Sequence, residues 1–390
     1  MCLTQNTNFL VVPLKQLSTD GKKNRDENPL QSTWARVSKM SALPTKATDP
    51  PSSITQAIVN HTPICLDGAL ATYLEALGAD ISGSLWSADV LLKNPCLIQQ
   101  AHLDYYRAGA QVAITASYQA SLPGLAQHLG TSKERDEDEE EEEVKAIVRK
   151  SVKLAQQARS EYLSEMVAAT SDGEEKAEKA RAGLWVAGSV GPYGAFLANG
   201  SEYRGDYALP REEMKAFHRG RIAALVEAGA DLLALETIPS QEETQALIEL
   251  LATEFPEAKA WFTFTLSSPT AIADGTPLSS LVPLFRGVEQ VVALGFNCVP
   301  EDVALAAIKT LQLLLLEEES MGSVGMVMYP NSGEQWNAQA REWEGSRTEG
   351  GLLGQKTRQW YTAGARLIGG CCRTMPKDIR VMREALNGLV

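Results

Sequence analysis

The sequence predicts an α/β fold, a single closed (β/α)8 barrel of the TIM type. From about residue 62 onward, short apolar runs rich in β-branched residues alternate with longer stretches of helical period. Eight such runs occur within roughly 330 residues, which favours a closed barrel over an open doubly wound sheet. The open sheet is the alternative, and it would leave the first and eighth strands unpaired.

The predicted strands are short and apolar, and they lie at residues 64–67, 111–115, 184–189, 231–236, 260–266, 291–298, 324–329 and 366–371. The predicted helices between and after them lie near residues 95–108, 143–166, 211–228, 241–254, 277–286, 301–318, 352–363 and 376–388. Two of these helices have recognisable starts. Ser240 can cap the helix that follows it, and Pro376 stands where a first-turn proline is tolerated.

The helix predicted over 143–166 should bury one face. Its apolar residues recur at helical spacing, namely Val144, Ile147, Val148, Leu154, Ala155, Ala158 and Tyr162. Two insertions lie between the second and third strands, near residues 132–143 and 170–182, and both should be solvated. The first is almost uniformly acidic, so we expect a mobile loop or a frayed helix start there.

Composition limits the partners of the chain. We expect residues 1–50 to form a disordered N-terminal extension and residues 51–390 to form the barrel domain. The formal net charge is −13, of which residues 134–143 contribute −8 and the rest of the chain −5. Without a basic stripe, such a chain is a poor ligand for nucleic acid. No apolar stretch approaches the length of a membrane span, so we expect small-molecule partners.

Cysteine usage indicates the compartment. The six cysteines of the 390 residues are too sparse for a disulfide scaffold, and no signal peptide opens the sequence. We therefore expect a reducing, cytoplasmic location.

In a barrel of this type the reactive groups gather where the strands end. Asp67 and Gly68 end the first predicted strand, Glu236 ends the fourth, Cys298 the sixth, and Cys371 with Cys372 the eighth. Each cysteine alone would be an ordinary core residue. Together, three thiolates are enough to hold zinc and leave its fourth tetrahedral position open, which is a catalytic arrangement.

One alternative competes with this metal site. Cys371 and Cys372 could form a disulfide, but a bond between consecutive residues is strained and would leave Cys298 without a role. Histidine ligands are not expected, because the four histidines stand away from the strand ends and read as surface or packing residues: His61, His102, His128 and His218.

The two carboxylates at strand ends indicate a polar ligand. Asp67 and Glu236 could each cap a helix or pair with an arginine; if both face the barrel mouth, they form an anionic site for an ammonium group beside the metal. The ligand would then be an amino compound with a thiol. The glycine-rich run at 188–194 lacks the C-terminal residues and the glycine spacing of nucleotide-binding loops. We expect its glycines to let the backbone approach a bound ligand closely.

Five motifs together carry a resemblance to a known family. They are LDGALATYLE at 66–75, GSVGPYGAFLANGSEYRGDY at 188–207, ALETIPS at 234–240, GFNCVP at 295–300 and GGCCRT at 369–374. The combination resembles the homocysteine S-methyltransferase family over about residues 62–388. The N-terminal extension and the two insertions are not part of the resemblance.

The resemblance implies a zinc ion held by Cys298, Cys371 and Cys372, with the homocysteine sulfur at the open position. It also implies that Asp67, with Gly68 beside it, and Glu236 bind the amino-acid end of the substrate, and that methionine is the product. Methyl donors differ within the family. The block at 188–207 is similar to the members that use S-methylmethionine, so we expect that donor first, S-adenosylmethionine second and betaine third; the length of 390 residues leaves no room for cobalamin and folate domains.

Two other functions stay open at this point. The same zinc chemistry would accept selenocysteine or selenohomocysteine as the methyl acceptor. A non-catalytic zinc or thiol sensor that recruits a partner through the acidic run at 134–143 is the alternative from another class.

Overall fold

The computed structural model describes residues 53–81, 87–130, 137–169, 171–337 and 342–389. The predicted extension at 1–50 and residues 134–136 of the acidic run lie outside these ranges.

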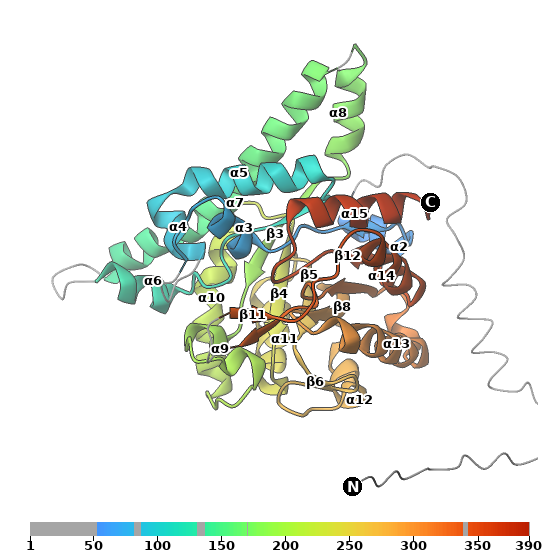
Figure 1. Cartoon of the computed structure of the whole chain (residues 1–390). Helices are drawn as coiled ribbons and strands as arrows, with labels where there is room; N and C mark the ends of the chain where they lie inside the picture. Colours follow the sequence, from blue (N-terminus) through green and yellow to red (C-terminus); the bar gives the residue numbers. More distant parts are fainter. Residues whose placement is uncertain (1–52, 82–86, 131–136, 170, 338–341, 390) are drawn as a thin grey trace, which may run out of the picture.

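Eight parallel strands form the barrel (Figure 1). Along the chain they are β1 (Ile64–Cys65), β2 (Val112–Ile114), β3 (Trp185–Val190), β4 (Leu232–Ile238), β5 (Ala260–Phe264), β8 (Val291–Asn297), β9 (Gly325–Tyr329) and β12 (Leu367–Ile368). β1 pairs with β12, and Leu66 bridges Val112 in parallel, so the first strand contacts both the last and the second. The closed barrel is confirmed, and the open sheet was the wrong alternative.

Helices surround the strands. The predicted ones are present as α5 (Pro95–Ala108), α7 (Glu137–Ala169), α10 (Arg211–Glu227), α11 (Gln241–Glu254), α13 (Glu301–Glu317), α14 (Gly350–Thr362) and α15 (Pro376–Asn387). The helix predicted near 277–286 is instead a short α12 (Leu278–Leu281) followed by a 3₁₀ turn, η2 (Val282–Phe285). Pro283 explains the break, because proline lacks the N–H that a continuing α-helix requires.

The sequence pattern did not reveal several shorter elements. The helices are α2 (Ile54–Val59), α3 (Leu70–Ala76), α4 (Ser87–Lys93), α6 (Leu122–Leu129), α8 (Gly173–Arg181) and α9 (Tyr193–Phe196), with 3₁₀ turns η1 (Ser201–Tyr203) and η3 (Glu319–Met321). Two hairpins follow strands of the barrel, β6 (Leu266–Ser268) with β7 (Ala271–Ile272), and β10 (Gln335–Asn337) with β11 (Glu342–Glu344).

The interior of the barrel is apolar from its N-terminal end to its middle. Alternate strand residues form one buried cluster, for example Trp185 and Ala187 of β3 with Leu232 and Ala234 of β4. Helix α2 adds Ile58 to the same cluster. Alternation along a strand then points Ser189 and Glu236, two positions further on, into the barrel at its C-terminal end.

Residues 137–143 of the acidic run form the start of a helix, which corrects the expected loop for these residues. Helix α7 begins at Glu137 and packs against α5 and α10, and only its C-terminal end projects from the barrel together with α8 (Figure 1). Acidic residues near a helix start interact favourably with the helix dipole, and Glu141 pairs with Lys145 at 2.7 Å one turn later. The expected buried face is confirmed by Val144, Val148 and Ala155.

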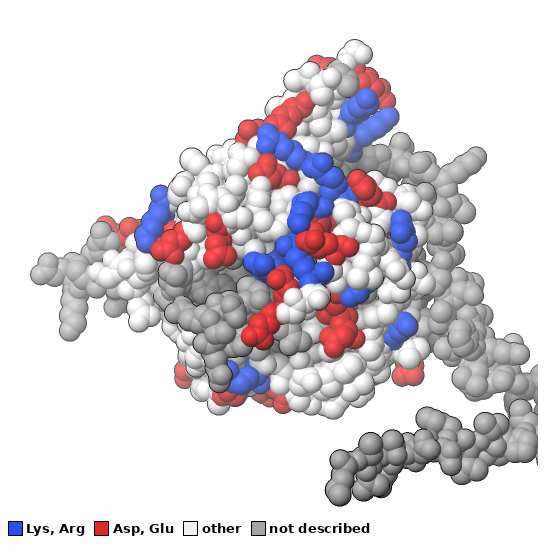
Figure 2. All heavy atoms as spheres, viewed as in Figure 1, with Lys and Arg blue, Asp and Glu red and all other residues white. Residues whose placement is uncertain are grey.

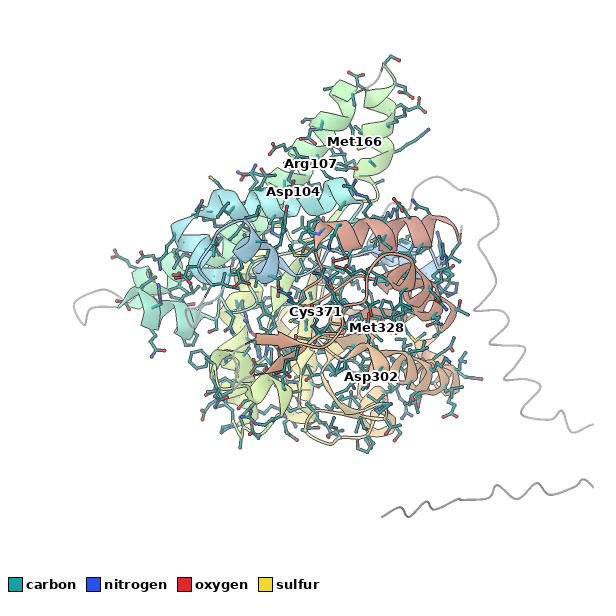
Figure 3. The ribbon with its side chains drawn as sticks, viewed as in Figure 1. Asp104, Arg107, Met166, Asp302, Met328 and Cys371 are labelled. Atoms are coloured by element: carbon teal, nitrogen blue, oxygen red, sulfur yellow. The ribbon has the colours of Figure 1, made fainter. Side chains whose placement is uncertain are left out.

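On the face shown in Figure 2, lysine and arginine side chains lie next to aspartate and glutamate side chains rather than in a basic stripe. One such pair is Arg107 and Asp104 of α5, 3.0 Å apart and labelled in Figure 3. Among the described residues, no helix is both long enough and apolar enough to cross a membrane.

Candidate metal centre

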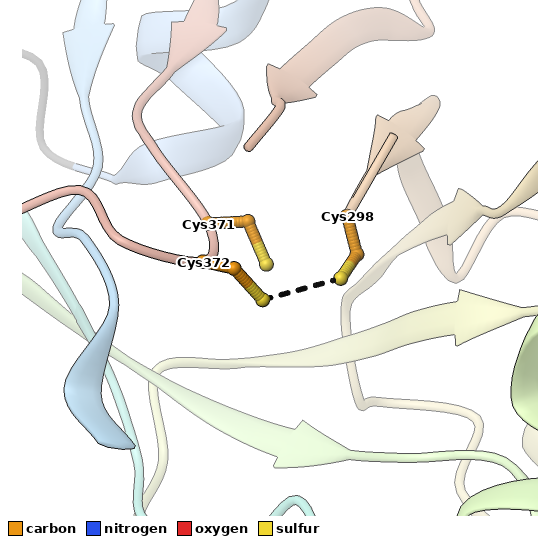
Figure 4. Close-up of side chains that lie close together, drawn as sticks. All are labelled: Cys298, Cys371 and Cys372. Carbon is orange, nitrogen blue, oxygen red and sulfur yellow. Dashed lines mark hydrogen bonds between the residues drawn. The ribbon is translucent and has the colours of Figure 1, made fainter. Parts of the chain in front are cut away.

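Three cysteine side chains converge at the C-terminal end of the barrel. Cys298 follows β8, and Cys371 and Cys372 follow β12, which lies two strands away in the order β12-β9-β8. The three sulfur atoms all lie within 4.8 Å of one another, and Sγ of Cys298 is 3.5 Å from Sγ of Cys372 (Figure 4). The structure thus brings together the thiols that the sequence placed on two separate strand ends. Cys371 lies among the strands at the middle of the molecule in Figure 3.

The backbone of β9 positions the cysteines on either side of it. The N–H of Cys298 donates to the carbonyl of Tyr329 at 3.2 Å, and the N–H of Cys371 donates to the carbonyl of Pro330 at 2.8 Å. Asn331 accepts from the N–H of Cys372 through Oδ1 at 3.2 Å. Hydrogen bonds from the main chain of all three cysteines, two to carbonyls and one to the Asn331 side chain, therefore hold the thiols to the end of β9 and the segment that leaves it.

Two glycines allow the chain to enter this turn. A Cβ atom at Gly369 would lie 2.6 Å from Cβ of Leu66, and one at Gly370 would lie 2.1 Å from the side chain of Thr374. Both distances are too short for a side chain. The Gly-Gly pair before the cysteines therefore serves the packing of β12 against the end of β1 and against the turn that follows.

The geometry of the thiols fits a tetrahedral metal ion. Bonds of ~2.3 Å to zinc at tetrahedral angles separate two sulfur ligands by about 3.8 Å. The 3.5 Å between Cys298 and Cys372, and the 4.8 Å limit for the trio, agree with this value. Thiolate ligands select zinc and other soft ions over magnesium or calcium. Residues Cys298, Cys371 and Cys372 therefore fit zinc, and a Cys371 to Cys372 disulfide is not formed, since both thiols are free.

The three thiols shift one another's pKa values. Hydrogen bonds from Cys371 and Cys372 hold the pKa of Cys298 well below its usual value. The bonds donated to Cys298 raise the pKa of Cys371 and of Cys372 well above the usual value. A bound cation would favour the thiolate form of all three cysteines.

Asp67 is buried at the end of β1. Its Oδ2 accepts from the N–H of Ile114 at 2.8 Å, so it does not cap helix α3 as the alternative proposed. Burial raises the pKa of Asp67 well above its usual value, and the charge of Glu236 raises it further. Its other oxygen, Oδ1, has no hydrogen-bond partner among the described residues. Asp67 therefore keeps one acceptor for a ligand.

Gly68 follows directly and lies against the turn after Cys372. A Cβ atom there would approach the carbonyl of Thr374 to 2.5 Å and the ring of Tyr105 to 3.0 Å. The close packing explains why glycine stands at this position. It also places the backbone beside Asp67 next to the turn that carries the cysteines.

Glu236 belongs to a polar layer, which consists of Ser189, Glu236, Thr263 and Tyr329. Oε1 of Glu236 accepts from Ser189, and Oε2 accepts from the Tyr329 hydroxyl at 3.0 Å. The Tyr329 hydroxyl in turn contacts Thr263 at 2.8 Å. Burial raises the pKa of Glu236 to about 7, against these hydrogen bonds. Ser240 caps α11 instead, so Glu236 is free of that task.

A side-chain link joins the end of β4 to the end of β8. Asn297 accepts from the N–H of Thr237 and donates to its hydroxyl, both at 2.8 Å. Thr237 and Cys298 both have positive φ, 64° and 53°, which is rare for residues with a side chain. Asn297 therefore couples the backbone beside Glu236 to the backbone of a metal-ligand candidate.

Sequence reasoning missed two neighbours of the thiols. The Tyr203 hydroxyl lies 3.4 Å from Sγ of Cys298, and Glu202 beside it is buried. Both are part of the motif at 188–207, but they lie on η1 rather than at a strand end, so the strand-end argument did not reach them. Of the four histidines, His102 and His218 are buried in α5 and α10. His102 packs without a hydrogen-bond partner among the described residues, whereas His218 contacts Glu243 at 2.7 Å and Arg221 at 3.1 Å, so it belongs to a buried polar network away from the thiols.

The sequence profile described as homocysteine S-methyltransferase matches residues 64–386. The chain belongs to the homocysteine S-methyltransferase family. It is thus an enzyme of this type. It is 50% identical over 321 residues to a homocysteine S-methyltransferase of Escherichia coli strain K12, covering 82% of this chain and 94% of the relative.

Two further relatives bear on the site. A crystal structure described as the metallated form of the homocysteine methyltransferase MmuM from Escherichia coli is 47% identical, with a TM-score of 0.70 over 84% of this chain and 98% of that one. A selenocysteine Se-methyltransferase of Brassica oleracea is 40% identical over 324 residues, which cover 82% of this chain and 88% of the relative. The expected family and fold are therefore confirmed.

Proposed function

We propose that this homocysteine S-methyltransferase depends on zinc and transfers a methyl group from a sulfonium donor to the thiol of L-homocysteine, which yields methionine. The observation that carries the proposal is the trio of thiols within 4.8 Å at the end of the barrel where Asp67 and Glu236 also lie. Zinc is the ion that three thiolates and one open position fit best.

Cys298, Cys371 and Cys372 would hold the ion. When bound, zinc supplies a Lewis acid that lowers the pKa of a substrate thiol, so that the reactive thiolate exists at neutral pH. An ordinary alkyl thiol titrates above neutrality and would be mostly unreactive. The residues of the chain would position the substrate and keep competing ligands away from the ion.

Asp67, Gly68 and Glu236 bind the amino-acid end of homocysteine in this proposal. The unpartnered Oδ1 of Asp67 is the acceptor available to an α-ammonium group. Glu236, held by Ser189 and Tyr329, adds a second carboxyl in electrostatic range of the first. The ammonium would compensate two carboxyl groups that burial otherwise disfavours as anions.

A sulfonium donor matches the charge change of the reaction. An electron pair of the homocysteine thiolate forms the new S–CH3 bond, while the pair of the breaking C–S bond returns to the donor sulfur. An anion and a cation thereby become two neutral thioethers. We propose S-methylmethionine as the preferred donor, S-adenosylmethionine as the second and betaine as the third.

A competition assay tests donor and metal together. The purified chain is given homocysteine with equal amounts of S-methylmethionine, S-adenosylmethionine and betaine, with and without a zinc chelator. We expect methionine formed chiefly from S-methylmethionine, and loss of turnover with the chelator that added zinc restores. Turnover that persists without metal, or that requires betaine, would contradict the proposal.

The likeness to a selenocysteine Se-methyltransferase favours a second acceptor. A selenol would take the position of the homocysteine thiol, and the rest of the site would act in the same way. The ratio of kcat/KM for selenocysteine and for homocysteine, measured with one donor, decides between the two acceptors.

For the cell, we propose a cytoplasmic, reducing location, because a zinc site of three thiolates requires reduced cysteines. The five cysteines of the described residues are all free, which agrees with this proposal.

A further inference from the structure

Glu202 is a buried acid that the proposed chemistry has not yet used. It lies on η1, in the segment between β3 and α10, and only 5% of its surface is exposed. Its carbonyl accepts from the Thr265 hydroxyl at 3.0 Å, at the end of β5. A Cβ atom at Gly194 would lie 2.6 Å from its N atom, so the segment is packed closely on both sides.

One carboxylate oxygen of Glu202 lacks a hydrogen-bond partner. Oε2 is buried and has no hydrogen-bond partner among the described residues. The charge of Arg204 attracts the Glu202 carboxylate, but the hydrogen bonds of Arg204 go to Asp206 at 2.7 Å, to the carbonyl of Asn199 at 3.3 Å and to the Ser201 hydroxyl at 3.3 Å. A buried carboxylate oxygen without a hydrogen-bond donor costs free energy, and a bound cation would compensate it.

Glu202 lies beside the metal centre. Its neighbour Tyr203 places a hydroxyl 3.4 Å from Sγ of Cys298, and the ring of Tyr203 is 46% exposed. Tyr118, which follows β2, lies within electrostatic range of Glu202, Cys298 and Glu236 at once. The unpartnered oxygen therefore belongs to the same end of the barrel as the thiols.

We propose that Glu202 binds the positive sulfur of the methyl donor. This inference rests on the proposed function, because it requires a sulfonium donor. A sulfonium centre has no N–H or O–H, so it attracts a carboxylate by charge alone and needs no hydrogen-bond geometry. An acid with a buried oxygen that lacks a donor suits such a ligand.

The charge change of the reaction decides which kinetic constant responds. The donor carries a full positive charge when it binds, part of it in the transition state and none after the methyl group has left. Glu202 therefore stabilises the bound donor more than the transition state, and it does not retain the neutral product. We expect its removal to raise the KM of the donor without lowering kcat.

The test compares ligands that differ in charge. Binding of S-methylmethionine and of methionine, its neutral demethylated form, is measured by titration calorimetry on the zinc-loaded enzyme and on Glu202→Gln. We expect the variant to bind S-methylmethionine roughly 10- to 100-fold more weakly and methionine as before, the range of a partly desolvated ion contact. Glu257→Gln, at an exposed position, removes the same charge and should change neither affinity.

Two further measurements distinguish a structural role of Glu202 from a role in binding the donor. Since Oε2 has no partner to lose, Glu202→Gln should not lower the melting temperature, and its zinc content and homocysteine KM should stay unchanged. Glu202→Asp keeps the charge and should retain most of the preference for the sulfonium.

The outcomes separate the two proposals. If the unaltered enzyme binds no sulfonium compound, the proposed donor class is wrong. If it binds S-methylmethionine and Glu202→Gln binds it equally well, only the role of Glu202 is wrong. Equal weakening of S-methylmethionine and methionine, or a change confined to homocysteine, would also overturn the assignment, because Glu202 would then contact an amino-acid end.

Discussion

Replacing Asn297 with Ala should weaken the barrel and its metal site together. Asn297 and Thr237 are 1% and 2% exposed, and two bonds of 2.8 Å join them. The substitution removes one ordinary side-chain bond, worth about 1 kcal/mol, and leaves the buried N–H of Thr237 unpaired, which costs about 1–3 kcal/mol. The total is a loss of roughly 2–4 kcal/mol in the free energy of unfolding.

The consequence for function follows from position. Asn297 precedes Cys298, and both Cys298 and Thr237 have the positive φ angles that the link holds in place. Without the link we expect Cys298 to relax toward negative φ, which moves its sulfur and lowers zinc affinity. The assay is equilibrium unfolding in urea with a chelator present, followed by zinc titration of the folded variant.

Thr237→Val is the matched control. It removes the hydroxyl but keeps the bond from the backbone N–H to Asn297, so its loss of unfolding free energy should be smaller, about 1–2 kcal/mol. If Asn297→Ala unfolded with a loss below about 0.5 kcal/mol and bound zinc normally, the link would have no structural role.

Three other changes test the site. Cys372→Ser should lose stoichiometric zinc and roughly 100-fold or more of the activity, and metal analysis with a turnover assay checks this. The pKa of Glu236 is raised to about 7, so its carboxylate forms as the pH rises through 7. We therefore expect the KM for homocysteine, measured from pH 5.5 to 8.5, to fall as the pH rises. The KM of Glu236→Gln should not change over that range. The same raised pKa stabilises the fold at low pH and loses that contribution between about pH 4.5 and 7, so urea midpoints of Glu236→Gln should lack this slope. Replacing the acids at 138–143 by Gln should leave turnover unchanged in the enzyme, whereas a sensor that recruits through them would lose its function.

Much of the fold was predictable because each strand of the barrel is a buried apolar run. Alternation and spacing located all eight strands, and the count led to closure. The limits were local. Pro283 ends a predicted helix after one turn and a 3₁₀ turn follows, and the acidic residues from Glu137 onward continue into α7, where Glu141 pairs with Lys145. Such local effects act against the periodic spacing of apolar residues. The hydrophobic pattern alone therefore does not predict the residue at which a helix or strand begins or ends.

The site was predictable where a reactive residue ends a strand. Cys298, Asp67 and Glu236 are all at such ends, and a closed barrel brings them to one face. Glu202 and Tyr203 were missed, because a loop between strands has no register that places its side chains. The polar layer around Tyr329 could have been predicted from the sequence. Each of its residues stands near the end of a strand, two positions after an apolar residue that points into the barrel.

X-ray absorption at the zinc edge tests the central claim most directly. The zinc-loaded chain should show about three sulfur ligands at ~2.3 Å, and homocysteine should increase the number to about four. A sulfur count that does not change when saturating homocysteine is added, or a first coordination sphere without the three cysteine sulfurs, would contradict the account.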